Sequence, residues 1–220
     1  MIKNRFIQLF SRLIILGIMI YSFTISIKNP NWYVYYTNLS NYFCLVVVLI
    51  EIIFNIINLS IRSTVSTKEF CPAIKFCALI GITVTFLVLN ILLDSPFRAE
   101  YWSFQENVLM HFVNPILFWL DYILFAEHNN TKALYPIYSI IFPLLYLAFI
   151  FIRSNFIKAG EGVIVYPYFF IDVKTLGVPK VIMWIAILVA VFVVLGYIIY
   201  IFDNIKNWKN KKKTFEKDLQ

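Results

Sequence analysis

The sequence predicts an all-α membrane protein, a single bundle of six transmembrane helices with both termini in the cytoplasm. Hydrophobic residues make up 61% of the chain, charged residues make up 14%, and the mean hydropathy is +0.78. Soluble domains contain about 45–50% apolar and about 25% charged residues. The apolar residues here gather in runs of about 18–24, a length that crosses about 30 Å of hydrocarbon.

Six such runs are separated by more polar connections. The first follows Lys3 and Arg5, and its apolar core is too long for a signal peptide. The fifth contains Pro136 and Pro143, which predict a kink because proline cannot donate a backbone hydrogen bond. We expect the spans at residues 7–27, 34–58, 73–93, 107–126, 133–152 and 179–202, in one domain covering residues 1–202.

The distribution of basic residues predicts the orientation. Thirteen Lys and Arg fall on the side of the termini and six on the other side, so the positive-inside rule places both termini in the cytoplasm. Residues 203–220 form a basic tail with six Lys against three acids, which suits anionic lipid heads better than nucleic acid. The wealth of Ile, Phe, Lys and Asn suggests a bacterial chain, and therefore the plasma membrane.

The fourth span carries polar residues at membrane depth. His111, Asn114, Phe118 and Asp121 are spaced three, four and three residues apart, which places them on one helix face. Polar groups inside a membrane are costly and almost always face the bundle interior. A longer stripe on the second span should also point inward, and its members are Thr37, Asn41, Cys44, Val48, Glu51, Asn55 and Asn58.

The predicted topology gathers most of this polar chemistry at the outer ends of the spans. Residues 153–178 form the longest connection, on the outer side. Within it, residues 162–172 are too few to span and apolar enough to lie at the interface or fold back as a lid. In the inner half, Arg12 and Glu51 can form a structural ion pair. The pattern names no partner for Asp121, which is expected to be structural or part of a proton path.

Four segments, taken in order with the six spans, resemble the androgen-inducible and androgen-dependent TFPI-regulating protein family, and in particular its bacterial branch named for recurrent prolines. The segments are Tyr35-Tyr-Thr-Asn-Leu-Ser-Asn41, Leu109-Met-His-Phe-Val-Asn-Pro-Ile-Leu-Phe-Trp-Leu-Asp121, Tyr135-Pro-Ile-Tyr138 and Tyr166-Pro-Tyr-Phe-Phe-Ile-Asp172. The resemblance implies an intramembrane threonine hydrolase of fatty acid esters of hydroxy fatty acids. By motif position, Thr37 corresponds to the nucleophile and His111 to the required histidine.

A threonine hydroxyl needs a base and donors for the oxyanion. His111 is the natural base. Asn38, Asn41 and Asn114 are candidate oxyanion donors, although Asn41 and Asn114 equally suit hydrogen bonds between helices. Asp94 or Asp172 can orient the imidazole. The remaining candidates around the substrate are Asn90 and Tyr166.

Each catalytic candidate also has an ordinary structural interpretation. The Thr37 hydroxyl can bond a backbone carbonyl near a helix start, and His111 can bond a neighbouring span. Ser40 is the next hydroxyl to consider if Thr37 is not the nucleophile. We expect no metal and no cofactor, because the chain lacks metal-ligand spacing, a phosphate-binding glycine loop and a Gly-x-Ser-x-Gly elbow.

Two functions from different classes follow from this pattern. The first is a lipid ester hydrolase that uses Thr37 and His111, with a membrane lipid as substrate and no nucleic acid partner. The alternative is a non-catalytic lipid-binding or transport protein that uses the same polar cavity. The polar stripe on the second span favours the alternative, because it continues inward to Glu51 and Asn58.

Overall fold

The computed structural model of the protein describes residues 2, 4–60, 70–93, 102, 104–157, 160 and 162–205. Over this part of the chain there is no strand, and six helices are long and apolar enough to cross a membrane. The predicted all-α, six-span membrane bundle is confirmed. The spanning helices are Arg5–Ser26, Tyr36–Ser60, Pro72–Leu92, Gln105–Phe125, Tyr135–Ser154 and Val178–Asp203.

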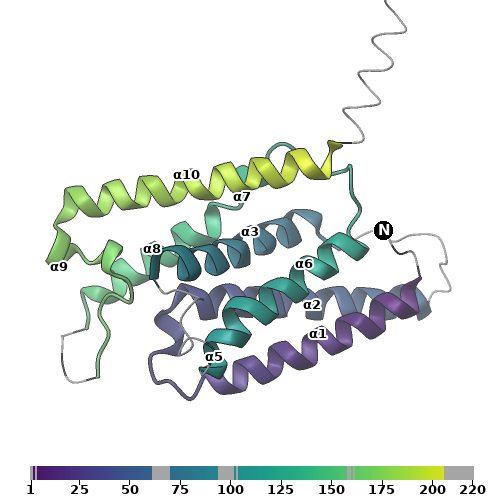
Figure 1. Cartoon of the computed structure of the whole chain (residues 1–220), viewed down its shortest axis with the longest axis horizontal. Coiled ribbons are helices and arrows are strands. Elements are labelled where there is room, and N and C mark those ends of the chain that lie inside the picture. The colour runs from purple at the N-terminus through teal and green to yellow at the C-terminus, as the bar shows by residue number, and fades with distance from the viewer. Residues whose placement is uncertain are drawn as a thin grey trace, which may run out of the picture.

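The spans lie side by side along the long axis of the molecule, and the N-terminus and the end of the last helix lie at the same end of the bundle (Figure 1). Short π-helical segments interrupt two of the spans. In chain order the elements are α1 (Arg5–Ser26), η1 (Trp32–Val34), α2 (Tyr36–Ser60), α3 (Pro72–Val88), η2 (Leu89–Leu93), α5 (Gln105–Val108), η3 (Leu109–Val113), α6 (Asn114–Phe125), α7 (Tyr135–Tyr138), α8 (Ile141–Ser154), η4 (Phe169–Ile171), α9 (Val173–Leu176) and α10 (Val178–Asp203).

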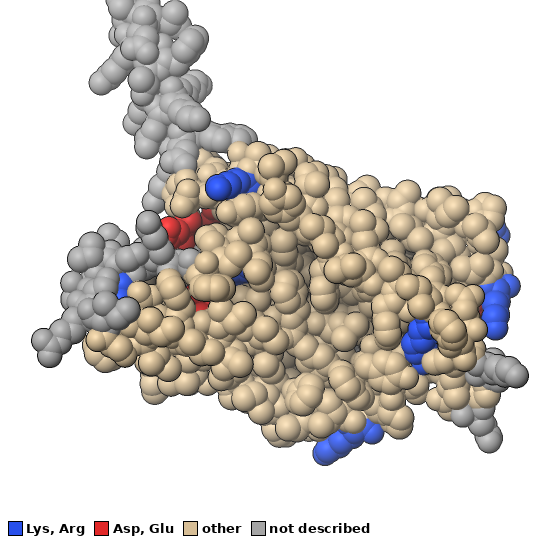
Figure 2. Space-filling view, turned by 180° about the vertical axis from the view of Figure 1, so that it is seen from behind, with Lys and Arg blue, Asp and Glu red and all other residues tan. Residues whose placement is uncertain are grey.

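The surface of the bundle is apolar, as the bilayer requires. The middle of the face in Figure 2 is almost free of charged side chains. Large apolar side chains such as Phe10, Leu145 and Ile182 are exposed on the spanning helices. The polar stripe of α2 faces inward as predicted, and its buried members are Asn41, Cys44, Val48, Glu51 and Asn55.

The fifth span is broken where its prolines predict a distortion. α7 ends at Tyr138 and α8 begins at Ile141, so Pro143 lies in the first turn of α8, where a helix needs no internal N–H donor. The hydroxyl of Ser139 donates to the carbonyl oxygen of Pro136 at 2.6 Å. α7 approaches α10 closely at Gly196, where an added Cβ would lie 2.9 Å from the Cβ of Pro136.

A buried cluster of charges joins four helices in the half of the bundle nearer the termini. Arg12 contacts the Glu51 carboxylate at 3.0 Å, which confirms the predicted ion pair. Arg12 Nε also donates to Asp121 at 2.8 Å, and Lys75 Nζ lies 2.7 Å from the other oxygen of Asp121. All four side chains are at most 5% exposed. Asp121 therefore has two partners, neither of which the sequence pattern named.

Candidate functional site

Two cavities meet at the end of the bundle opposite the termini. The first, which we call the apolar slot, encloses about 60 Å³ between α3, α8 and α10. The second, which we call the polar chamber, encloses about 320 Å³ between the start of α2, α5, η3 and the 167–169 segment. The residues that line both cavities are Thr37, Leu89, His111 and Tyr168.

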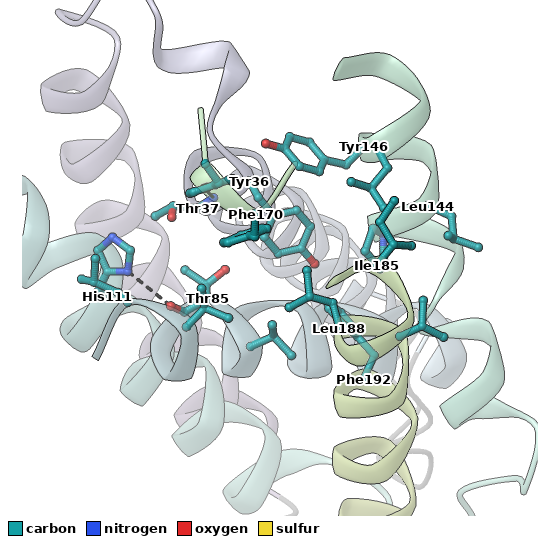
Figure 3. A pocket seen from close by; sticks show the side chains of 17 residues that line it. Tyr36, Thr37, Thr85, His111, Leu144, Tyr146, Phe170, Ile185, Leu188 and Phe192 are labelled. Carbon is teal, nitrogen blue, oxygen red and sulfur yellow. Dashed lines mark hydrogen bonds between the residues drawn. The ribbon is translucent and has the colours of Figure 1, made fainter. Parts of the chain in front are cut away.

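The apolar slot reaches the lipid-facing surface between α8 and α10. Leu144 lines the slot and is also 46% exposed. In Figure 3, Thr37 and His111 lie at one end of the slot, with Leu188 and Phe192 toward the other. The slot is narrow, so an acyl chain fits only where the lining side chains move apart. Its lining and its opening both suit a lipid tail rather than a polar ligand.

Thr37 lies in the first turn of α2, at the boundary between the two cavities. The first turn of a helix contains N–H groups that have no partner within the helix. The N–H of Thr37 points to the hydroxyl of Tyr168 at 3.4 Å. The Thr37 side chain is half-buried, and both Thr37 and Tyr168 line the two cavities. Thr37 therefore lies at the cavity wall rather than in the core.

His111 lies in the π-helical segment η3 and is 7% exposed. Its Nδ1 lies 3.4 Å from the carbonyl oxygen of Thr85, as the dashed line in Figure 3 shows. A carbonyl oxygen can only accept, so this contact places the proton on Nδ1 and leaves Nε2 with a lone pair. The Thr85 carbonyl lies near the point where α3 gives way to η2. There the N–H of Leu89 donates to the carbonyl oxygens of both Thr85 and Phe86.

Asn41 and Asn114 connect the spans around His111. In the π-helical segment η3, each N–H donates to the carbonyl five residues earlier, so the N–H of Asn114 donates to the carbonyl of Leu109. The next donor would be Pro115, which has no N–H, so the carbonyl of Met110 is left for another donor. Asn41 Nδ2 donates to that carbonyl at 3.0 Å and to the Thr37 carbonyl at 2.8 Å.

The same pair of asparagines extends the link to α1. Asn114 Nδ2 donates to Asn41 Oδ1 at 2.8 Å, and the hydroxyl of Ser22 lies 3.3 Å from Asn114 Oδ1. Both amide hydrogens of Asn41 are used, one within α2 and one in the bond that joins α2 to η3. Asn41 and Asn114 thus hold the segments that carry Thr37 and His111, and neither lines the two cavities.

The connection between α8 and α10 folds back over the site. Arg153 donates to the carbonyl oxygens of Ile164 and Val165, and its guanidinium lies 5.4 Å from the ring centre of Tyr33. The rings of Tyr168 and Phe170 stack at 5.1 Å, almost parallel, and both line the apolar slot. Burial raises the pKa of the Tyr168 hydroxyl, so it remains a protonated donor at neutral pH.

The other sequence candidates have different positions. Asn38 is buried, lines the polar chamber and donates to the carbonyl of Trp32 at 3.0 Å. Asn90 donates to the carbonyl of Phe86 at 2.6 Å, and Tyr166 packs on Phe151, while neither lines a cavity described above. Asp94 lies outside the described residues.

Asp172 caps helix α9 and lines neither of the two cavities. Its carboxylate accepts from the N–H groups of Lys174 and Thr175, which begin α9. Bonds from Thr175, whose hydroxyl also donates to the carboxylate, lower the pKa of Asp172. The group that meets the imidazole is the Thr85 carbonyl, not Asp172. The sequence suggested that a carboxylate orients the imidazole of His111, whereas in the structure the backbone carbonyl oxygen of Thr85 contacts that ring.

Sequence reasoning missed Tyr168 and Thr85. Tyr168 belongs to the Tyr166–Asp172 segment, but only the direction of the folded loop decides which of its tyrosines faces Thr37. Thr85 contributes a backbone atom, which no residue pattern reveals. Among the described residues no group of three or more His, Cys, Asp or Glu is placed to hold a metal ion.

No protein-family profile, no curated protein and no solved structure matches this chain.

Proposed function

We propose that this protein is an intramembrane lipid ester hydrolase in which Thr37 is the nucleophile and His111 the base. The observation that carries the proposal is the junction of the two cavities. Thr37, His111 and Tyr168 line both the apolar slot and the polar chamber, so an ester with its acyl chain in the slot has its carbonyl beside them. Membership of the family that the four segments resemble is part of the same proposal.

The first half of the reaction forms an acyl-enzyme. The oxygen of Thr37 attacks the ester carbonyl carbon, and its proton passes to Nε2 of His111, which the Nδ1 contact to Thr85 leaves unprotonated. The bond from the carbonyl carbon to the alcohol oxygen breaks. His111 gives the proton to the departing alcohol, and the acyl group stays on Thr37.

The second half returns the enzyme to its starting state. A water molecule attacks the acyl carbon while His111 takes one of its protons. The bond to the Thr37 oxygen breaks, the fatty acid leaves, and the proton from His111 restores the hydroxyl. The oxyanion of both steps is held by the Tyr168 hydroxyl and by N–H groups in the first turn of α2.

The inner part of the α2 stripe supports this proposal over lipid transport. Its continuation to Glu51 was the feature that favoured a binding or transport protein. Glu51 is 3.0 Å from Arg12 in a buried cluster that ties helices together. The inner stripe thus has a structural use, and the two cavities that meet at Thr37 lie at the other end of the bundle. With the predicted orientation, the site opens at the outer leaflet of a bacterial plasma membrane.

The test is labelling of the purified protein with a fluorophosphonate, a reagent that modifies activated hydroxyls. Wild type should be labelled, and Thr37→Ala and His111→Ala should each lose labelling by about 100-fold, because base catalysis contributes about 10²–10⁴. Thr24→Ala is the matched control, since this exposed threonine bonds only the carbonyl of Tyr21. Labelling that persists in Thr37→Ala would show that another residue, with Ser40 the nearest hydroxyl along α2, is the nucleophile.

A further inference from the structure

The described lining of the polar chamber contains an acidic side chain but no basic Lys or Arg. Among its described lining residues, the single side chain charged at neutral pH is Glu106, in the first turn of α5, and no Lys or Arg is present. The neutral polar groups of the lining include the side-chain amides of Asn29, Asn38 and Asn107, which both accept and donate hydrogen bonds.

Aromatic rings form much of the remaining wall. Tyr35, Tyr168 and Phe169 line the chamber, and the rings of Tyr35 and Tyr168 meet edge to face at 6.3 Å. Tyr35 and Glu106 line the same chamber, and burial, followed by the charge of Glu106, raises the pKa of Tyr35. A carboxylate beside aromatic faces is the arrangement that attracts ammonium groups.

We propose that the polar chamber selects lipid esters whose head group is cationic, with a quaternary ammonium as the best fit. The inference deepens the proposed hydrolase function and rests on it for the reaction, but not for binding. The acyl chain lies in the apolar slot, the ester lies at Thr37, and the ammonium group lies between Glu106 and the aromatic wall. An ester of a 2-hydroxy fatty acid places a carboxylate there instead, against the charge of Glu106.

The experiment compares esters that share one acyl chain and differ in head-group charge. Palmitoylcholine is cationic, monopalmitoylglycerol is neutral, and palmitoyl hydroxystearate, with its hydroxyl at carbon 2 so that the carboxylate lies beside the ester, is anionic. Wild-type protein in nanodiscs should show its highest kcat/KM with palmitoylcholine and its lowest with palmitoyl hydroxystearate. Glu106→Gln, which keeps the shape of the side chain, should lower kcat/KM for palmitoylcholine about three- to tenfold and leave the neutral ester nearly unchanged.

Two further variants sharpen the comparison. Glu106→Lys should reverse the order, with palmitoyl hydroxystearate becoming the best of these substrates. Glu127→Gln is the matched control, because Glu127 lies beyond the opposite end of the same span and lines neither cavity. The inference is overturned if wild type prefers the anionic ester, or if Glu106→Gln keeps the wild-type order unchanged.

Binding of the corresponding hexadecyl ethers, which cannot be hydrolysed, separates this inference from the hydrolase proposal. The cationic ether should bind most tightly and the anionic ether most weakly. If the ethers bind in this order but no ester is hydrolysed, the head-group inference is supported and the hydrolase proposal is overturned. Hydrolysis that depends on Thr37 but shows no preference for charge would do the opposite. Absence of both hydrolysis and charge-dependent ether binding would overturn both.

Discussion

Nδ1 of His111 faces the carbonyl oxygen of Thr85 at 3.4 Å, so a backbone atom of α3 sets the tautomer of the only histidine within a span. This contact directs the basic Nε2 away from α3. Catalytic histidines usually rely on such a partner to fix which nitrogen carries the proton. Here the partner is placed where the regular α-helical bonding of α3 gives way to η2.

Tyr168→Phe tests the oxyanion donor of the proposed mechanism. The substitution removes the hydroxyl that meets the N–H of Thr37 and keeps the ring stacked on Phe170. We expect kcat to fall about 100-fold with little change in KM, because an oxyanion donor acts mainly in the transition state. Tyr166→Phe is the control. Equal kcat values for the two variants would remove Tyr168 from the mechanism.

Asn41→Ala tests the link between the segments that carry Thr37 and His111. The variant leaves the Met110 carbonyl and the Asn114 amide without their partner in α2, so we expect a loss of about 1–3 kcal/mol in unfolding free energy. Asn58→Ala is the control, because Asn58 donates only to Phe54 of its own helix. Thermal unfolding in detergent measures both, and losses of equal size would contradict this role.

Asp121→Asn tests the buried charges. Removing the anion that Arg12 and Lys75 share should lower the unfolding free energy by about 3–5 kcal/mol, since buried cations then lose a main partner. Adding Lys75→Met to Asp121→Asn should recover part of that loss. Lys132→Met, at an exposed site, should have little effect. Additive effects of Asp121→Asn and Lys75→Met would show that the two groups are not coupled.

Gly196→Ala tests the close approach of α7 and α10. The added methyl group would lie 3.0 Å from the Cα of Pro136, a backbone atom that cannot turn away. We expect a loss of about 1–3 kcal/mol from overpacking. Gly17→Ala, with nothing within 4 Å of the added group, should instead stabilise α1 by up to about 1 kcal/mol. A harmless Gly196→Ala would mean that the helices can separate at little cost.

His128 gives the stability a defined dependence on pH. Its Nδ1 lies 2.5 Å from Asp203 and its Nε2 lies 2.9 Å from the carbonyl of Ile123, so both nitrogens face acceptors and the ring is cationic. The bond to Asp203 raises the pKa of His128 above its ordinary value. The contact therefore stabilises fully below pH about 6.5, the unfolded value, and is lost as the pH rises through the folded value.

The measurement is thermal unfolding in detergent on both sides of that window. Between pH about 6 and pH about 9 we expect a loss of about 1 kcal/mol, the scale of a partly exposed charged hydrogen bond. His128→Gln should be less stable at the lower pH and should not lose this increment as the pH rises. An identical pH dependence in wild type and variant would assign the effect to other groups.

Most of the fold could be predicted from the sequence, because bilayer thickness fixes both the length and the composition of each span. The proline break in the fifth span and the Arg12–Glu51 pair were also predictable. The pairing of Lys75 with Asp121 was not. Lys75 lies near the start of its span, where a lysine usually counts as a cytoplasmic surface charge, and only the packing of α3 against α6 buries it.

The site was predictable only in part. Motif positions named Thr37 and His111, and both line the two cavities. The path of the 153–178 connection was not encoded in any local pattern, so the sequence pointed to Tyr166 and Asp172 where the fold places Tyr168. The π-helical turn at η3 depends on how Pro115 and Asn41 satisfy the backbone together, which is a property of two spans rather than one.

The buried charge cluster also imposes an order on biosynthesis. Arg12 is made 109 residues before Asp121, so α1 enters the bilayer long before that carboxylate exists. A guanidinium at membrane depth costs about 2.5–3.5 kcal/mol on insertion scales. Glu51, on the next span to emerge, is the first anion that can meet it. In the growing chain, Glu51 is thus available to Arg12 as soon as α2 is made, and Asp121 on α6 completes the set later.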